Sequence, residues 1–380
     1  MKRNWALAIV AALLLAFIVT VVAGCEGDRT TINLYFGEGG GGGGGDDDTG
    51  GDDDTGDDDT GESDFEVLRG AAEEVVTGEA APYVVKATDL HDLLNDGDAG
   101  DDPFLLDLRS SSDYSSAAYG HIYGSDGAEA VNIGFAAVAD NIDDIPTDEQ
   151  IIVYCYTGHT ASMTGMWLRM LGYDAYILKF GMMGWNPDRM GEGKNPFDPD
   201  TAPHYEVCDG DHEFTDEYSF PEIDTGEGNA HDIILNRAAA VLQEVADQGH
   251  PHVIKASDLH DLLNDGDAGD DPFILDIRKA DDFSSSTYGH ICGDDGTEAY
   301  NIPYGEMFSE DTLKYLPTDK QIVVYCYTGH TASQVAFALR MMGYDAYSLK
   351  FGMMGWNPDK MGEGKNPFNP DDAPHYETTD

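Results

Sequence analysis

The sequence predicts an α/β protein of two tandem domains, each a mostly parallel sheet flanked by helices, behind a disordered tether. The first observation is a duplication: residues 86–109 recur at 255–278, an offset of 169, and residues 155–205 at 326–376, an offset of 171. The second is that strand-like and helix-like patterns alternate within each repeat, which is typical of parallel sheets. The third is a glycine and aspartate tract near the start, which has nothing to bury in a core.

The first 25 residues have the features of an export signal. Lys2 and Arg3 precede an apolar stretch over residues 5–22, which closes with Val-Ala-Gly-Cys. This tetrad resembles the lipobox of bacterial lipoproteins, in which the cysteine, here Cys25, is lipidated. The alternative is an uncleaved membrane anchor, although the stretch is near the lower length limit for spanning a bilayer. In both cases we expect the rest of the chain outside the cytoplasm, in the cell envelope and held to a membrane.

Residues 26–64 are expected to form an extended, solvated tether. Glycines fill positions 39–45, and repeats of Asp-Asp-Asp-Thr-Gly follow, with 11 acidic residues between positions 46 and 64. Like charges repel one another and keep such a segment open. Calcium capture by the aspartates is the alternative, but their spacing does not match an EF-hand loop.

Composition limits the partners of the protein. The chain has 20 Lys and Arg against 73 Asp and Glu, a formal net charge of -53, so it lacks the basic patches that bind nucleic acid. The acidity extends through both repeats, which suggests a salty or calcium-rich medium that screens self-repulsion. With 380 residues, the chain is long enough for two or three domains with cores.

The elements of each repeat follow in a regular order. An amphipathic helix is predicted at 65–76 and again at 231–246, followed by a short helix with Thr88 or Ser257 as its N-cap. In the first repeat, strands are then predicted at 104–109, 130–133, 152–155 and 175–179, and a helix at 161–171. We place the domains at 65–205 and 230–380, joined by an acidic linker at 206–229.

A cysteine ends one strand in each repeat, just before a short glycine-containing loop and a helix. These are Cys155 and Cys326. The arrangement places a thiol at the carboxyl edge of a sheet, where ligands bind, and opposite the amino end of a helix. Loop amides and the helix dipole favour the thiolate there, as a nucleophilic cysteine requires. The alternative is a cysteine that merely packs at a strand end.

The other cysteines are too few for a fold built on disulfides. Cys208 lies in the predicted linker and is expected to be exposed, while Cys292 is a weak candidate for a resolving thiol. No cysteine or histidine spacing matches a zinc site, and we expect neither a metal nor a cofactor.

Taken together, the motifs of each repeat resemble a rhodanese (sulfurtransferase) domain. The first repeat matches through Leu-Asp-Leu-Arg at 106–109, Gly-His-Ile at 120–122, Val-Asn-Ile at 131–133, the loop 155–160 and the segment 172–185, and the second repeat has their counterparts. No single motif is specific, but their order and spacing are, and they cover nearly all of both repeats. The whole chain resembles an exported tandem-rhodanese lipoprotein.

The resemblance implies a mechanism. Cys155 and Cys326 would take the outer sulfur of a donor such as thiosulfate, a persulfide or a polysulfide and pass it to a thiol or cyanide. The loop amides would cradle the bound sulfur as an anion, with glycine allowing the turn. The loop residues in question are Tyr156, Thr157, Gly158, His159 and Thr160 in the first repeat, and Tyr327, Thr328, Gly329, His330 and Thr331 in the second.

Several residues have a second interpretation. His159 and His330 are donors or mild bases, or else solvated loop histidines. The pairs Asp107 with Arg109 and Asp276 with Arg278 are expected to brace strand ends. Packing is the expected role of Trp185 and Trp356, and a surface position is expected for Arg169 and Arg340, late in their helices.

This sequence departs from the family pattern in two ways. Neither loop contains the Arg or Lys that many thiosulfate-using members place beside the cysteine. A persulfide or a polysulfide therefore fits as the sulfur donor as well as thiosulfate does. Both repeats keep the cysteine, whereas many tandem members keep only the second. Phosphatases of this fold use a longer loop closed by an arginine, which is absent here.

The sequence thus predicts a sulfurtransferase. The alternatives are a binding or redox-sensing module without turnover, and a structural surface protein. The expected partners are a small sulfur donor, a thiol acceptor and a membrane.

Overall fold

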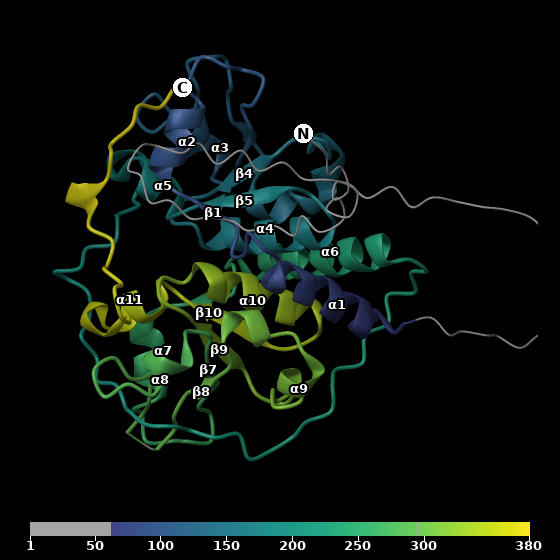
Figure 1. Cartoon of the computed structure of the whole chain (residues 1–380), viewed down its shortest axis with the longest axis vertical. Coiled ribbons are helices and arrows are strands. Elements are labelled where there is room, and N and C mark those ends of the chain that lie inside the picture. Colours follow the sequence, from purple (N-terminus) through teal and green to yellow (C-terminus); the bar gives the residue numbers. More distant parts are fainter. Residues whose placement is uncertain (1–61, 295) are drawn as a thin grey trace, which may run out of the picture. The chain divides into compact units, whose positions relative to one another are not determined.

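The computed structural model describes residues 62–294 and 296–380 (Figure 1). The predicted export signal, Cys25 and nearly all of the predicted tether lie outside these residues. Within them, no helix combines the length and apolar character needed to cross a bilayer. The described chain forms two α/β units with parallel sheets and flanking helices, and this confirms the predicted fold class.

The first repeat contains a five-stranded parallel sheet in the order β1-β5-β4-β2-β3. Its strands are β1 (Val84–Val85), β2 (Phe104–Asp107), β3 (Val131–Asn132), β4 (Ile151–Tyr154) and β5 (Ala175–Leu178). Every residue of the central strand β4 is buried, as the continuous β-branched and aromatic run predicts for a strand covered on both faces. The residue that follows this strand is Cys155.

The second repeat has the same topology, in the order β6-β10-β9-β7-β8. Its strands are β6 (Val253–Ile254), β7 (Phe273–Asp276), β8 (Tyr300–Asn301), β9 (Ile322–Tyr325) and β10 (Ala346–Leu349). The central strand β9 is again buried throughout and ends at Cys326. Both cysteines therefore leave the middle strand of a sheet at its carboxyl edge.

The helices match the prediction in type and differ at their starts. The long helices are α1 (Asp64–Thr77), α4 (His159–Met170), α6 (Ala230–Gln248) and α10 (His330–Met341), and the shorter ones are α2 (Ala87–Leu93), α3 (Ser111–Tyr114), α5 (Gly181–Trp185), α7 (Ala256–Leu262), α8 (Ala280–Phe283), α9 (Glu310–Leu313) and α11 (Gly352–Trp356). The predicted N-caps Thr88 and Ser257 are wrong. Lys86 and Lys255, with extended backbones, precede the first turn, so each hydroxyl falls inside its helix.

The two repeats share one hydrophobic core. Helices α4 and α10 pack against each other, and α1 and α6 pack against them, between the two sheets (Figure 1). Buried residues of both repeats, such as Trp167 and Phe337, belong to the same cluster. The opposite faces of the sheets have separate clusters, one around Trp185 and one around Trp356. The long apolar helices are thus the joint between the repeats.

The end of each repeat packs on the other repeat. After the first repeat, Cys208 pairs with His290 of the second, and the Trp356 indole donates to the Glu206 carbonyl at 3.1 Å. At the end of the chain, Thr379 pairs with His121 of the first repeat. The Trp185 indole donates to the Glu377 carbonyl at 3.2 Å, so both tryptophans have the predicted packing role. The predicted linker, residues 206–229, contacts both repeats: the Tyr218 amide donates to Lys314 of the second, and Phe220 stacks on Phe65 of α1 in the first.

Cys208 and Cys292 form a disulfide. This corrects two expectations, because Cys208 is not a free exposed thiol and Cys292 is not available as a resolving thiol. The two cysteines are 84 positions apart in the sequence and meet because the segment that follows each repeat packs on the other repeat, an arrangement called here the exchange of tails. Among the described residues, the free cysteines are Cys155 and Cys326.

The expectation for the late-helix arginines is also wrong. The Arg169 guanidinium lies 3.6 Å from the Tyr83 ring centroid and donates to Asp174 at 3.0 Å. Arg340 pairs with Asp345 at 2.8 Å and with Glu244 of α6. Both side chains are therefore half-buried: the aliphatic part of each arginine is covered by its neighbours, while the guanidinium is paired with carboxylates.

Candidate active site

The thiol loop of each repeat is a tight turn between a central strand and a long helix. Gly158 has φ of 90° and Gly329 has φ of 87°, in the left-handed region that favours glycine. Helices α4 and α10 start at the next residue, earlier than predicted, and no side chain caps either one. The first-turn amides and the positive end of each helix dipole therefore remain available to an anion.

One loop amide donates to the sulfur in each repeat. The Gly158 N–H lies 3.1 Å from Cys155 Sγ, and the Gly329 N–H lies 3.1 Å from Cys326 Sγ. The cysteines are 3 % and 2 % exposed. Each sulfur is thus nearly enclosed, and a backbone N–H of its own loop donates to it, an interaction that stabilises negative charge on an acceptor.

The loop tyrosines fasten the turns to a neighbouring helix. The Tyr156 hydroxyl donates to Asp113 at 2.7 Å and accepts from the Ser110 amide at 3.1 Å. Tyr327 does the same with Asp282, at 2.7 Å, and with the Lys279 amide. Thr160 and Thr331 are half-buried. The tyrosines therefore hold the loop in place, beside the one backbone amide that donates to each sulfur.

His159 and His330 are the first residues of α4 and α10, and both are buried. Their Nε2 atoms accept hydrogen bonds from the other repeat: the Phe351 amide reaches His159 and the Phe180 amide reaches His330, both at 2.9 Å. Since Nε2 accepts, Nδ1 carries the proton and donates to Thr157 or Thr328, at 3.0 and 2.9 Å. The solvated-loop interpretation of these histidines is wrong, because each ring is enclosed where the two repeats meet.

Burial also keeps these imidazoles neutral. It lowers the pKa of His330 to about 3, with a further contribution from Lys179. The pKa of His159 is lowered well below its ordinary value by burial, and then by His330 and Lys350. The basic lone pair of each ring, on Nε2, already accepts an amide of the other repeat. The histidines therefore link the repeats and offer no free base for proton transfer.

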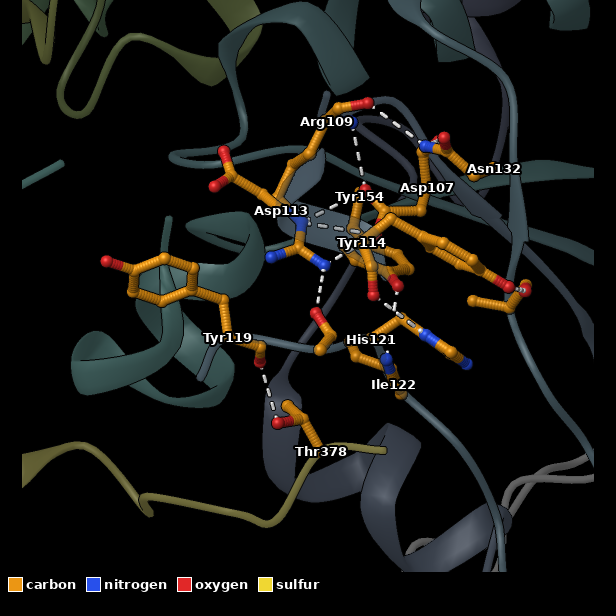
Figure 2. A network of polar contacts seen from close by, with 12 residues as sticks. Asp107, Arg109, Asp113, Tyr114, Tyr119, His121, Ile122, Asn132, Tyr154 and Thr378 are labelled. Atoms are coloured by element: carbon orange, nitrogen blue, oxygen red, sulfur yellow. Dashed lines mark hydrogen bonds and ion pairs between the residues drawn. The ribbon is translucent and has the colours of Figure 1, made fainter. Parts of the chain in front are cut away.

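Asp107 and Arg109 form a buried ion pair at the end of β2 (Figure 2). Arg109 Nη2 lies 2.6 Å from Asp107 and 2.5 Å from the Gly120 carbonyl, and Nη1 donates to the Met190 carbonyl at 3.2 Å. Figure 2 also shows Thr378, from the tail of the second repeat, donating to the Tyr119 carbonyl at 2.7 Å. The pair braces three chain segments beside the thiol loop.

Asp276 and Arg278 repeat this arrangement in the second unit. The guanidinium lies 2.6 Å from the carboxylate, 2.5 Å from the Gly289 carbonyl and 3.0 Å from the Met361 carbonyl. Burial opposes the charge of Arg278, but Asp276 more than compensates and raises its pKa. The role is structural, as the sequence predicts, because every donor is engaged within the protein.

A cavity of about 800 Å³ opens at Cys326. Two of its lysines, Lys86 and Lys179, come from the first repeat, and a third, Lys365, from the second. A cavity of about 520 Å³ has the corresponding Lys255 and Lys350, and Cys155 does not line it. The thiol loops lack basic residues, as the sequence shows, but the opposite repeat supplies them.

Sequence reasoning missed these lysines because they lie far from the cysteines in the chain. A signal was present: in a chain with so few cations, Lys86, Lys179 and Lys194 recur at the matching positions of the second repeat. Their convergence on a thiol follows only from the packing of the repeats. In the described part of the chain, no group of three or more metal-ligating side chains is close enough to hold a metal ion.

The chain was compared with known families, curated proteins and solved structures. The rhodanese-like domain family matches the chain twice, at residues 86–188 and 255–359. No curated protein gives a match. Solved structures that are similar include a rhodanese-related protein from Thermoplasma volcanium (24% identity, 28% of this chain and 89% of that one, TM-score 0.22). A rhodanese-like domain protein from Staphylococcus aureus has 20% identity and a TM-score of 0.23, and the match covers 30% of this chain and 97% of that one. A thiosulfate sulfurtransferase from Pseudomonas aeruginosa has 18% identity and a TM-score of 0.26, and the match covers 81% of this chain and 49% of that one.

Proposed function

Because the chain belongs to the rhodanese-like domain family, which matches both of its repeats, we propose that it is a sulfurtransferase acting through a cysteine persulfide. The observation that carries this proposal is the setting of Cys326. Its sulfur accepts the Gly329 amide at the start of α10, and the residue lines a cavity with three lysines. A backbone donor at the sulfur and cations lining the same cavity together favour attack by Cys326 on an anionic sulfur compound.

The reaction has two balanced steps. In the first, the thiolate attacks the outer sulfur of the donor, an S–S bond forms on Sγ, and the donor's own S–S bond breaks. With thiosulfate, sulfite leaves with the electron pair. In the second, an acceptor thiolate or cyanide attacks the outer sulfur, and the electron pair of the broken bond returns to Sγ. The Gly329 amide and the first-turn amides of α10 would hold the persulfide anion between the steps.

The test is thiocyanate formation from thiosulfate and cyanide, with mass spectrometry of both loop peptides after donor treatment. We expect the wild type to gain the mass of one sulfur on the Cys326 peptide. Cys326→Ser should remove most activity, and Cys155→Ser should remove less, because Cys326 lines the cavity of about 800 Å³ and Cys155 lines neither of the two cavities described above. Undiminished activity in the double variant would overturn the proposal.

A binding or redox-sensing role is the second candidate for the first repeat. The observation that favours it is that Cys155, although as buried as Cys326, lines neither of the two cavities. In that case the Cys155 peptide would gain no sulfur from any donor and would instead oxidise reversibly with peroxide.

We further propose that the protein lies outside the cytoplasm on a lipid at Cys25. The units would be an export signal at 1–25, a tether at 26–64, domains at 65–205 and 230–380, and a linker at 206–229. The disulfide between Cys208 and Cys292 supports an oxidising compartment. Labelling with a radioactive fatty acid should mark the wild type, and Cys25→Ser should lose both the label and the membrane association. Equal labelling of both would contradict the anchor.

A further inference from the structure

The lysines form two clusters that repeat the two-fold arrangement of the chain. The first, the Cys326-side triad, is Lys86, Lys179 and Lys365. All three line the cavity that reaches Cys326. Lys365 also lies 4.8 Å from the ring centroid of Tyr327, the residue after the thiol. The cluster therefore lines the same cavity as Cys326, and two of its members belong to the other repeat.

These charges are not neutralised within the protein. Across residues 62–294 and 296–380, no lysine of the triad forms an ion pair, although the chain has 73 acidic residues. The cavity has one acidic lining residue, Asp372. Burial, and then Lys86 and Lys365, lowers the pKa of Lys179. Three like charges gathered without counter-charges raise the electrostatic potential of the cavity and favour an anion there.

The cavity is also too large and too apolar for a small inorganic anion alone. Its volume of about 800 Å³ lies in the range of sites for organic ligands. Phe180 and Phe368 form part of the wall, with ring centroids 5.0 Å apart, and Pro82 and Pro367 line it as well. Such a wall matches a carbon skeleton, and the triad matches several negative charges on it.

We propose that the Cys326-side triad binds a multiply charged organic thiol or its persulfide, and that Lys86 and Lys179 provide this specificity from the opposite repeat. This inference rests on the proposed function. The charges lie on the body of the ligand, so its sulfur is left free to face Sγ. The transfer step is then the attack of the bound thiolate on the outer sulfur of the Cys326 persulfide, with release of the Sγ thiolate. One S–S bond forms, one breaks, and the net charge is unchanged.

The first experiment tests the anion site without any sulfur transfer. Iodoacetate is anionic and iodoacetamide is neutral, and both alkylate the same thiol. Mass spectrometry of the Cys326 peptide gives the ratio of the two rates. We expect the double variant Lys86→Met and Lys179→Met to lower this ratio about fivefold or more, because two cations near the sulfur are lost.

Two control variants test the assignment to the opposite repeat. Lys255→Met with Lys350→Met alters the matched positions of the other cluster and should leave the Cys326 ratio at its wild-type value. Lys320→Met removes an exposed lysine elsewhere and should do the same. Lys179→Arg keeps the charge and should preserve the ratio, which separates charge from folding. An unchanged ratio in the Lys86 and Lys179 double variant would overturn the proposal.

The second experiment tests the ligand class in the Cys155→Ser background. Cys326 is first converted to its persulfide, and the rates of sulfur transfer to mercaptosuccinate, with two carboxylates, and to neutral mercaptoethanol are compared. We expect a preference for mercaptosuccinate that the double variant loses. Equal rates in the unmodified triad would overturn the organic-anion assignment. If no persulfide forms with any donor, the proposed function fails, while the alkylation ratio still reports on the anion site.

Discussion

The histidine at the start of each long helix has both ring nitrogens engaged. In His330, Nδ1 donates to Thr328 and Nε2 accepts the Phe180 amide of the other repeat. Phe180 has φ of 63°, a left-handed conformation uncommon for a residue with a side chain, and it aims this amide at the ring. A proton on Nε2 would remove the acceptor and face the amide with a second donor. The contact therefore exists only with a neutral imidazole.

This gives a prediction for stability against pH. The folded-state pKa of His330 is about 3, below the unfolded value of 6.5, so below pH 6.5 the unfolded chain binds more protons. Stability should be complete above pH 6.5 and fall with decreasing pH until about pH 3. The charge of Lys179 also lowers the pKa of His330 and so acts in the same direction. Two pH units below 6.5, the loss from this group is about 2 to 3 kcal/mol.

Urea unfolding at several pH values checks this in wild type and His330→Gln. The glutamine oxygen can accept the Phe180 amide without titrating, so the variant should have a shallower slope between pH 6.5 and 4.5. His231→Gln, at an exposed histidine, should keep the wild-type slope. Identical slopes in wild type and His330→Gln would contradict the buried neutral assignment.

The buried ion pairs give a second prediction at this scale. Arg109→Leu leaves Asp107 charged, buried and without its guanidinium partner, and should reduce the free energy of unfolding by about 3 to 5 kcal/mol. Arg189→Leu, at a half-buried arginine nearby, should cost far less. The measurement is chemical denaturation, and a loss below about 1 kcal/mol for Arg109→Leu would show that water or rearrangement compensates the carboxylate.

At the scale of elements, local patterns predict what local forces decide. The run from Ile152 to Tyr154 reads as a strand buried on both faces, and the glycine after it predicts the turn to a helix. The type and order of both elements follow from these signals. The sequence predicts the start of α4 two residues too late, because His159 is a polar residue whose burial includes contacts with Phe351 of the other repeat.

Contacts between distant residues lie beyond such patterns. The Phe351 amide and His159 are 192 positions apart, and Lys179 approaches the Cys326 cavity from the first repeat. Periodicity reports which face of a helix is apolar, and it does not report which partner covers that face. The sequence therefore predicts the cysteines, the turns and the Asp-Arg pairs, and it gives no account of the lysines or of the histidine contacts.

The disulfide gives a prediction at this scale. It closes a separation of 84 residues and fixes the segment after the first repeat to the second. Cys292→Ser should lower the free energy of unfolding by about 2 to 4 kcal/mol, because the unfolded chain gains freedom. Thermal unfolding of oxidised and reduced wild type and of the variant checks this. The reduced wild type should match Cys292→Ser, and a variant equal to the oxidised protein would refute the stabilising role.

The first repeat has matching positions at which a second disulfide can be introduced. Thr379 corresponds to Cys208 and pairs with His121, as Cys208 pairs with His290, and Tyr123 corresponds to Cys292. Tyr123→Cys with Thr379→Cys should therefore form a second disulfide under oxidising conditions. Loss of free thiol by mass spectrometry would show it.

For the whole molecule, charge is the dominant feature. The formal net charge of -53 destabilises the compact state through self-repulsion. Raising sodium chloride from about 0.05 to about 1 M shortens the screening length from roughly 14 to 3 Å and should raise the melting temperature. Calcium and magnesium at equal ionic strength should give equal shifts if screening alone acts. A larger shift with calcium would instead indicate specific binding of that ion.

The exchange of tails has a consequence for how the two halves relate. Each unit is completed by a segment of the other, with reciprocal histidines and lysines across a common helical joint, so the chain has the organisation of a symmetric homodimer fused end to end. In a homodimer, every substitution appears twice. Fusion removes that obligation: the second half carries the disulfide to Cys208, and its Cys326 lines the larger of the two cavities. In a protein built in this way, one repeat can keep the catalytic cysteine while the other repeat diverges to supply residues that line its binding site.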